Sequence, residues 1–223
     1  MVRSLMLVLW LTGMKLSAQT IDIGLSLVGS NYSGDLTENS IIAIKQTNLG
    51  IGSNVRYELN DFLAAKVQYL YMVVEGSDLK SKREWQIQRN LQFRTAIHNV
   101  DILGQINLSG ILFQQKKRWN PYLTLGLSYF NFNPKAKYQD QWVELKPLGT
   151  EGQGMKGYAE PYKLDSKALT FGFGGRYSFS PNLSLTVEFL WRQTNTDYLD
   201  DASTNYVDYD ELKAQNGLLA AEL

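Results

Sequence analysis

The chain carries few side chains of the kinds that usually perform catalysis or bind metals. It has 223 residues, one His and no Cys. This composition excludes thiolate zinc sites, a Cys nucleophile, a disulfide scaffold and any site built on several imidazoles. Three glycines, Gly152, Gly154 and Gly157, have the spacing of a dinucleotide-binding loop. They follow no predicted strand and open no helical pattern, so we interpret the segment as an ordinary loop.

The single imidazole, His98, is the next candidate for chemistry. It shares one face of an alternating strand with Ala96, Val100 and Ile102. This predicts that His98 points outward, toward lipid, near the end of the strand. A lipid-modifying barrel enzyme that uses His98 together with a Ser is the competing hypothesis. An unchanged lipid profile after His98→Ala would exclude that enzyme.

Charged clusters supply two further candidates. Acidic side chains gather near the C-terminus, where a calcium site is conceivable because hard cations prefer oxygen ligands, but no spacing specifies one: Asp200, Asp201, Asp208, Asp210 and Glu211. The basic run Lys116, Lys117 and Arg118 predicts a solvated turn that could contact lipid head groups or an acidic partner. We expect no catalytic residue, no cofactor, no bound metal and no small-molecule substrate. The balance of 22 basic and 22 acidic residues argues against nucleic acid as a partner.

The elements that must position these residues are strands. Seven runs alternate apolar and polar residues with period two, the pattern of a strand whose two faces differ. They are Thr20–Ser30, Asn48–Asn60, Phe62–Gly76, Gln92–Leu108, Pro121–Phe132, Lys167–Ser180 and Leu183–Tyr198. Such lengths exceed those of ordinary soluble strands and match the 9–11 residues that a tilted strand needs to cross a membrane.

The faces and connections of these strands predict a transmembrane barrel. Turns at Asn60–Asp61 and Pro181–Asn182 alternate with longer loops at Asn31–Thr47, Ser77–Leu91 and Asn133–Ser166, as in outer-membrane barrels. If the apolar face points to lipid, the inward face carries four acids and four bases, which we expect to pair inside a narrow, closed barrel. These are Asp22, Arg56, Glu58, Lys66, Asp101, Arg176, Glu188 and Arg192. Period two does not say which face is inside, so a soluble lipocalin-like barrel stays open.

The first residues are typical of a targeting segment. A short basic start with Arg3 precedes the mostly apolar stretch Leu5–Leu16, and the small residues Ser17 and Ala18 follow. This predicts a secretory signal peptide over residues 1–18, removed after Ala18. The remaining 19–223 would form one outer-membrane barrel domain.

Two stretches of sequence go beyond a generic barrel pattern. The first, Gly29–Leu36, contains Asn31, Tyr32, Gly34, Asp35 and Leu36. The second, Trp191–Asp208, contains Asp197, Tyr198, Asp200 and Asp201. With Asn54–Tyr57 and Phe173–Tyr177, they resemble the PorG family of outer-membrane β-barrels, a part of the type IX secretion machinery that also supports gliding motility in some Gram-negative bacteria.

The resemblance implies a non-enzymatic component of a secretion complex. It implies contact with a periplasmic ring made of a lipoprotein of PorK or GldK type and a partner of PorN or GldN type. Such contact would use the short turns around Asn60–Asp61, Lys116–Trp119 and Pro181–Asn182. The alternative is a stand-alone surface barrel, similar to OmpX or OmpW, that binds ligands through its outer loops.

The end of the chain departs from the family pattern. Family members continue to a last strand, whereas Glu211–Leu223 has helix-forming composition interrupted by Gly217. Bacterial single-chain barrels have even strand numbers. We therefore expect an eight-stranded type of barrel with the last strand missing from this chain, and we leave residues 208–223 as a tail that could supply it.

Overall fold

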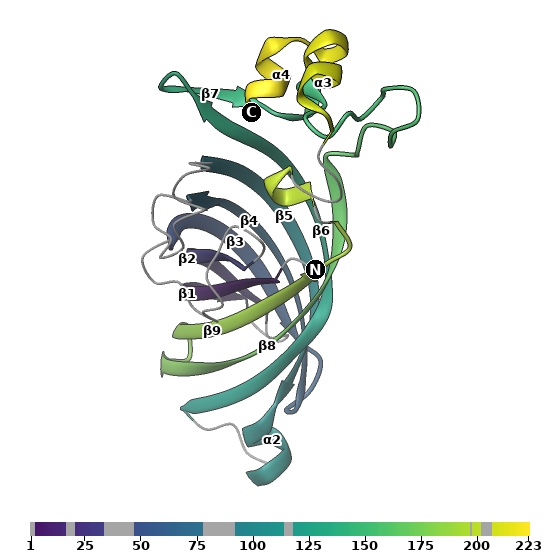
Figure 1. Ribbon diagram of the computed structural model, residues 1–223. Coiled ribbons are helices and arrows are strands. Elements are labelled where there is room, and N and C mark those ends of the chain that lie inside the picture. Colours follow the sequence, from purple (N-terminus) through teal and green to yellow (C-terminus); the bar gives the residue numbers. More distant parts are fainter. Residues whose placement is uncertain are drawn as a thin grey trace.

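The computed structural model describes residues 3–16, 21–33, 47–77, 92–113, 118–196, 198–201 and 207–223. Of residues 3–16, 32–33, 77, 113 and 200, only the backbone is described. The fold is all-β, antiparallel and up-and-down, and its strands wrap around a common interior (Figure 1).

Eight long strands of 11 to 20 residues form the barrel wall. They are β1 (Arg3–Leu16), β2 (Ile21–Ser33), β3 (Asn48–Glu58), β4 (Leu63–Ser77), β5 (Gln92–Asn107), β6 (Trp119–Tyr138), β8 (Asp165–Ser180) and β9 (Leu183–Thr194). The sheet order is β5-β4-β3-β2-β1-β9-β8-β6-β7, and β5 also pairs with β6. Among the eight wall strands, β5 and β6 are the two ends of this row, and their pairing closes the eight strands into a ring.

All seven predicted strands are present, and they form a continuous arc from β2 through β5 and β6 to β9. The eighth wall strand is β1, which pairs with β2 on one side and β9 on the other. It is built from the segment that we predicted to be a signal peptide. The tail does not supply a strand, because its described part is helical.

The prediction that Asn133 begins a long loop is wrong. Strand β6 continues to Tyr138. It pairs with β5 as far as Ala136, and its residues Lys135–Tyr138 pair with the short strand β7 (Gln141–Glu144). The alternation of burial also continues, with Phe132, Pro134 and Ala136 buried. The polar residues in this stretch obscured the strand, since they sit where β6 rises beyond most of the wall.

The two ends of the barrel differ in their connections (Figure 1). The short-turn end carries the links β1–β2, β3–β4 and β8–β9, and the helix α2 (Leu108–Phe113) between β5 and β6. The long-loop end carries the links β2–β3, β4–β5 and β6–β8, the 3-10 helices η3 (Lys146–Leu148) and η4 (Tyr198–Asp200), and the helices α3 (Tyr209–Asn216) and α4 (Leu218–Glu222). The alternation of short and long connections expected from the sequence is therefore present.

The apolar faces of the strands point outward. Leu25, Leu49, Ile102 and Leu127 are 66 to 84% exposed. Their alternating neighbours point inward and include the charged residues. A lipocalin-like barrel with its apolar face inward does not fit this arrangement. Among the described helices, none is long and apolar enough to cross a membrane.

Candidate functional site

The inner wall near the short-turn end holds a network of paired charges. Arg56 Nη1 lies 3.2 Å from Asp22 Oδ2 and 2.8 Å from Glu58 Oε1. Arg176 contacts the same two carboxylates, with Nη2 on Asp22 and Nη1 3.4 Å from Glu58. Two guanidinium groups thus share two carboxylates across strands β2, β3 and β8.

A second set of charges lies further along the interior. Lys66 Nζ is 2.6 Å from Glu188 Oε2, and both side chains are completely buried. Arg192 Nη2 is 2.6 Å from Asp101 Oδ2, which also accepts a hydrogen bond from Gln68. Gln105 joins the two sets, because its Nε2 donates to Glu188 at 3.0 Å and its Oε1 accepts from Arg56 at 2.7 Å.

All eight charged residues that the sequence placed on the inward face are members of these sets. Charges taken out of water are tolerated when partners and hydrogen bonds compensate them. Four acids and four bases meet that condition from six different strands, β2, β3, β4, β5, β8 and β9. The network therefore links strands on different sides of the barrel and occupies the interior near the short-turn end.

The interior changes character toward the long-loop end, where it is apolar. The inward side chains of this layer form one buried cluster: Val28, Leu70, Met72, Val74, Phe93, Ile97, Phe130, Phe132 and Leu190. The sequence analysis missed this layer. A signal was present at Leu70–Val74, where both faces of the strand are apolar and the alternation is lost.

Residues from the loops close this apolar layer. Tyr162 stacks between Phe132 and Tyr198, with ring centroids 6.4 and 4.4 Å away. Leu199 is 2% exposed, and its carbonyl accepts a hydrogen bond of 2.6 Å from Thr95 on β5. Tyr162, Tyr198 and Leu199 together form what we call the cap.

A buried carboxyl fastens the cap. Asp201 accepts hydrogen bonds from the hydroxyls of Thr150 and Tyr162. Burial raises the pKa of Asp201 to about 6, although the two hydroxyl bonds act in the opposite direction. Burial and the neighbouring Asp201 also raise the pKa of Tyr162, so its hydroxyl stays protonated and donates.

Beyond the cap lies a small outer head, made of residues 145–162 with α3 and α4. Its own core consists of Met155, Leu212 and Ala220. The side chain of Asp208 caps α3 by accepting from the backbone N–H groups of Asp210 and Glu211 at 3.0 and 3.2 Å. Tyr158 Oη donates to Glu211 Oε2 at 3.0 Å and ties the loop to this helix.

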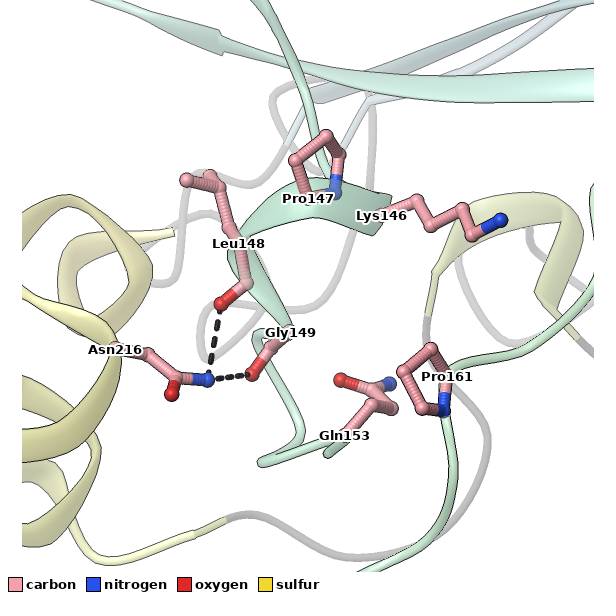
Figure 2. Close-up of a pocket in the computed structure, with 7 residues that line it drawn as sticks. All are labelled: Lys146, Pro147, Leu148, Gly149, Gln153, Pro161 and Asn216. Atoms are coloured by element: carbon pink, nitrogen blue, oxygen red, sulfur yellow. Dashed lines mark hydrogen bonds between the residues drawn. The ribbon is translucent and has the colours of Figure 1, made fainter. Parts of the chain in front are cut away.

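The head contains a pocket of about 530 Å³ (Figure 2). Its lining comes from η3, the loop that follows it and the end of α3: Lys146, Pro147, Leu148, Gly149, Gln153, Pro161 and Asn216. Asn216 Nδ2 donates to the carbonyls of Leu148 and Gly149 at 3.1 and 3.0 Å. The sequence analysis did not find this pocket, because its lining residues are far apart in the chain and follow no period.

The residues that carry the family resemblance gather at the long-loop end. Asn31 is buried and accepts a hydrogen bond of 3.1 Å from Thr47, while Tyr198 and Asp201 belong to the cap and its fastening. Tyr32 lies in β2 and Asp200 in η4, where only the backbone is described. Gly34, Asp35, Leu36 and Asp197 lie outside the described residues.

The remaining candidates from the sequence lie away from the interior. Arg118 is exposed at the short-turn end, and its carbonyl accepts from Ser178 N at 2.8 Å. Lys116 and Lys117 lie outside the described residues. His98 points outward from β5, where its Nδ1 is 2.7 Å from Tyr69 Oη and its ring lies 5.0 Å from that of Tyr71.

The glycine-rich loop and the acidic residues near the C-terminus were two further candidates from the sequence. Gly152, Gly154 and Gly157 have positive φ angles of 75, 86 and 96°, which glycine adopts readily in a winding loop. No group of three or more His, Asp or Glu side chains in the described part of the chain could hold a metal ion.

Comparison with protein families places the chain in a described family. A family model described as a domain of unknown function, DUF6089, matches residues 2–218, which is nearly the whole chain. No curated protein matches the sequence.

Proposed function

We propose that this chain, which belongs to the DUF6089 family, is a non-enzymatic outer-membrane barrel that anchors a type IX protein secretion complex. In this proposal the long-loop end faces outward from the cell. The short-turn end faces the periplasm and contacts a ring of lipoprotein subunits of PorK or GldK type and partners of PorN or GldN type.

The single observation that carries the membrane assignment is the inversion of the faces. Large apolar residues such as Leu25, Ile102 and Leu127 are 73, 67 and 66% exposed on the outside, while charged residues are buried inside. In water this arrangement would expose an extensive apolar surface. In a bilayer the arrangement is favourable, because lipid contacts the apolar face and neighbouring strands pair their backbone groups.

A structural role is supported by how the interior charges are used. The eight charged side chains of the lumen are bonded to one another and to amide and hydroxyl groups of the wall. The apolar layer and its cap fill the rest of the interior. These features favour a rigid barrel with a filled interior, which could anchor other proteins of the complex in the membrane.

The resemblance to the PorG family supports the secretion role. Its described residues Asn31, Tyr198 and Asp201 stabilise the long-loop end, so we assign these segments to ordering the outer loops. The periplasmic contact is then left to the short-turn end, where Ile111, Leu112 and Trp119 are 53, 70 and 54% exposed beside Arg118.

The test is crosslinking followed by purification of the tagged full-length protein from outer membranes. We expect a stoichiometric periplasmic ring to be recovered and to be lost when Lys116, Lys117 and Arg118 are replaced by Gln. Replacing Lys156 of the outer head and the adjacent Lys163 by Gln is the matched control and should leave recovery unchanged. A protein recovered alone, with secretion intact in its absence, would exclude this role and favour a stand-alone surface barrel.

A further inference from the structure

The pocket of the outer head presents a buried hydrogen-bond donor whose direction is fixed. Gln153 is 7% exposed. Its Oε1 accepts the backbone N–H of Glu151 at 3.0 Å, which sets the orientation of the amide. Its Nε2 is buried and has no hydrogen-bond partner among the described residues. A buried donor without an acceptor is unfavourable, so the entry of an acceptor into the pocket is favoured.

The wall opposite Gln153 is held in place before any ligand arrives. Asn216 at the end of α3 bonds the carbonyls of both Leu148 and Gly149 (Figure 2). Gly149 has a φ of +57°, and a Cβ there would lie 2.8 Å from the carbonyl oxygen of Gln153 and 2.9 Å from Asn216 Nδ2. The close approach of these segments therefore requires glycine, and the pocket keeps its shape without a ligand.

The remaining lining residues favour a ligand that has a negative charge and an apolar part. Lys146 supplies a cation and forms no ion pair with any residue that the structure describes. Pro147, Leu148 and Pro161 supply apolar surface to the lining, and the Gln153 side chain lies between Gly149 and Pro161 in Figure 2. A cavity of about 530 Å³ is the size of small-molecule sites.

We propose that this pocket binds the carboxylate of a small organic acid. Gln153 Nε2 and Lys146 Nζ donate to the carboxylate oxygens, and the two proline rings and Leu148 contact the apolar body. Charge-assisted hydrogen bonds of this kind are about twice as strong as neutral ones, so the acid is distinguished from its amide. This site is separate from the secretion role proposed above and does not depend on it.

The test is calorimetric titration of the full-length protein in detergent with 4-methylpentanoate and, as the neutral control, 4-methylpentanamide. We expect the acid to bind at least about tenfold more tightly than the amide. Gln153→Glu keeps an oxygen for the Glu151 N–H but replaces the donor by a negative charge, and should weaken acid binding at least about tenfold. Lys146→Gln should weaken it about three- to tenfold, whereas Lys163→Gln, outside the pocket, should have no effect.

A second titration distinguishes two kinds of ligand, a free organic acid and the C-terminal carboxylate of a peptide. A short peptide that ends in Leu with a free carboxylate is compared with 4-methylpentanoate. Tighter binding of the peptide assigns the site to a chain terminus, and equal binding assigns it to free acids. Equal affinity for acid and amide, unchanged affinity of a folded Gln153→Glu variant, or no saturation by about 20 mM acid would overturn the proposal, whatever the result of the crosslinking experiment.

Discussion

Lys66 and Glu188 are 122 residues apart in the sequence, yet their Nζ and Oε2 atoms form a 2.6 Å ion pair in the barrel interior. The pair connects β4 to β9 across the lumen, and both side chains are fully buried. Removing one member of such a pair leaves a buried charge without compensation. We expect Lys66→Met to lower the free energy of unfolding by about 3–5 kcal/mol, measured by urea titration of the protein in lipid vesicles.

Removing both charges should restore most of that loss. In Lys66→Met/Glu188→Met no isolated charge remains, and the residual loss of about 1–3 kcal/mol comes from Gln105, whose Nε2 donates to Glu188 at 3.0 Å. The exposed pair Lys135–Glu144, at 3.0 Å with side chains 37 and 50% exposed, is the control. Lys135→Met should change stability by less than about 1 kcal/mol. Equal losses for Lys66→Met and Lys135→Met would contradict the structural role of the network.

The sequence was sufficient to place Lys66 and Glu188 inside the barrel, because strand alternation assigns each residue to a face. Lys66 alternates with Ala65 and Val67, and Glu188 alternates with Val187 and Phe189. Once the apolar faces are outward, both charges must lie inside the barrel, and a buried charge requires a partner. The pairing partners themselves depend on sheet register, which the sequence alone does not fix.

Other features could not be predicted, because the residues that form them follow no periodic pattern in the sequence. Asp201 meets Thr150 and Tyr162 through irregular loops, with separations of 51 and 39 residues. The pocket around Gln153 arises in the same way. The segment Arg3–Leu16 has no alternation of apolar and polar residues, so its pairing as β1 is visible only when β2 and β9 lie on either side of it.

The buried carboxyl of Asp201 makes the cap sensitive to pH. Its pKa is raised from the ordinary value near 3.8 to about 6 in the folded protein. The folded state therefore binds more protons than the unfolded state between pH 4 and 6, and stability must fall as the pH rises through this window. This difference in pKa between the two states corresponds to about 3 kcal/mol of folding free energy. We expect amide hydrogen exchange at the cap residues Tyr162, Tyr198 and Leu199 to be slower at pH 4.5 than at pH 7, after correction for intrinsic rates.

The variant Asp201→Asn should remove this pH dependence. The amide side chain does not titrate and retains an oxygen that accepts one of the two hydroxyls. Strand β5 and its neighbour β4 serve as the internal reference, because their protection should not follow the same profile. A wild-type cap that becomes more protected as the pH rises from 4 to 6 would contradict the burial of this carboxyl.

On the outward face of the barrel, a charged substitution should be more destabilising the closer it lies to the middle of the bilayer. Ile102 on β5 and Leu112 on α2 are 67 and 70% exposed, so they are equally accessible from outside the protein. Ile102 lies within the wall, whereas Leu112 lies at the short-turn end. If the barrel spans a bilayer, Ile102→Arg should cost about 2–4 kcal/mol and Leu112→Arg about 0–1 kcal/mol in vesicles. Small and equal effects of the two substitutions would exclude a membrane-spanning wall.

The strand β1 raises a distinct prediction about the mature protein. Since β2 and β9 are each antiparallel to β1, they run parallel to one another on either side of it. Cleavage after Ala18, as the sequence predicts, would remove β1 and leave two facing strand edges whose backbone groups are unpaired. We expect intact-mass measurement of the protein from outer membranes to give a chain that begins at Gln19.

We further expect amide exchange in β2 and β9 of residues 19–223 to be at least about tenfold faster than in the full chain, with β4 and β5 unchanged. Equal protection of β2 and β9 in both chains would mean that the seam closes by direct parallel pairing, and a mass beginning at Met1 would make β1 a permanent strand of the barrel.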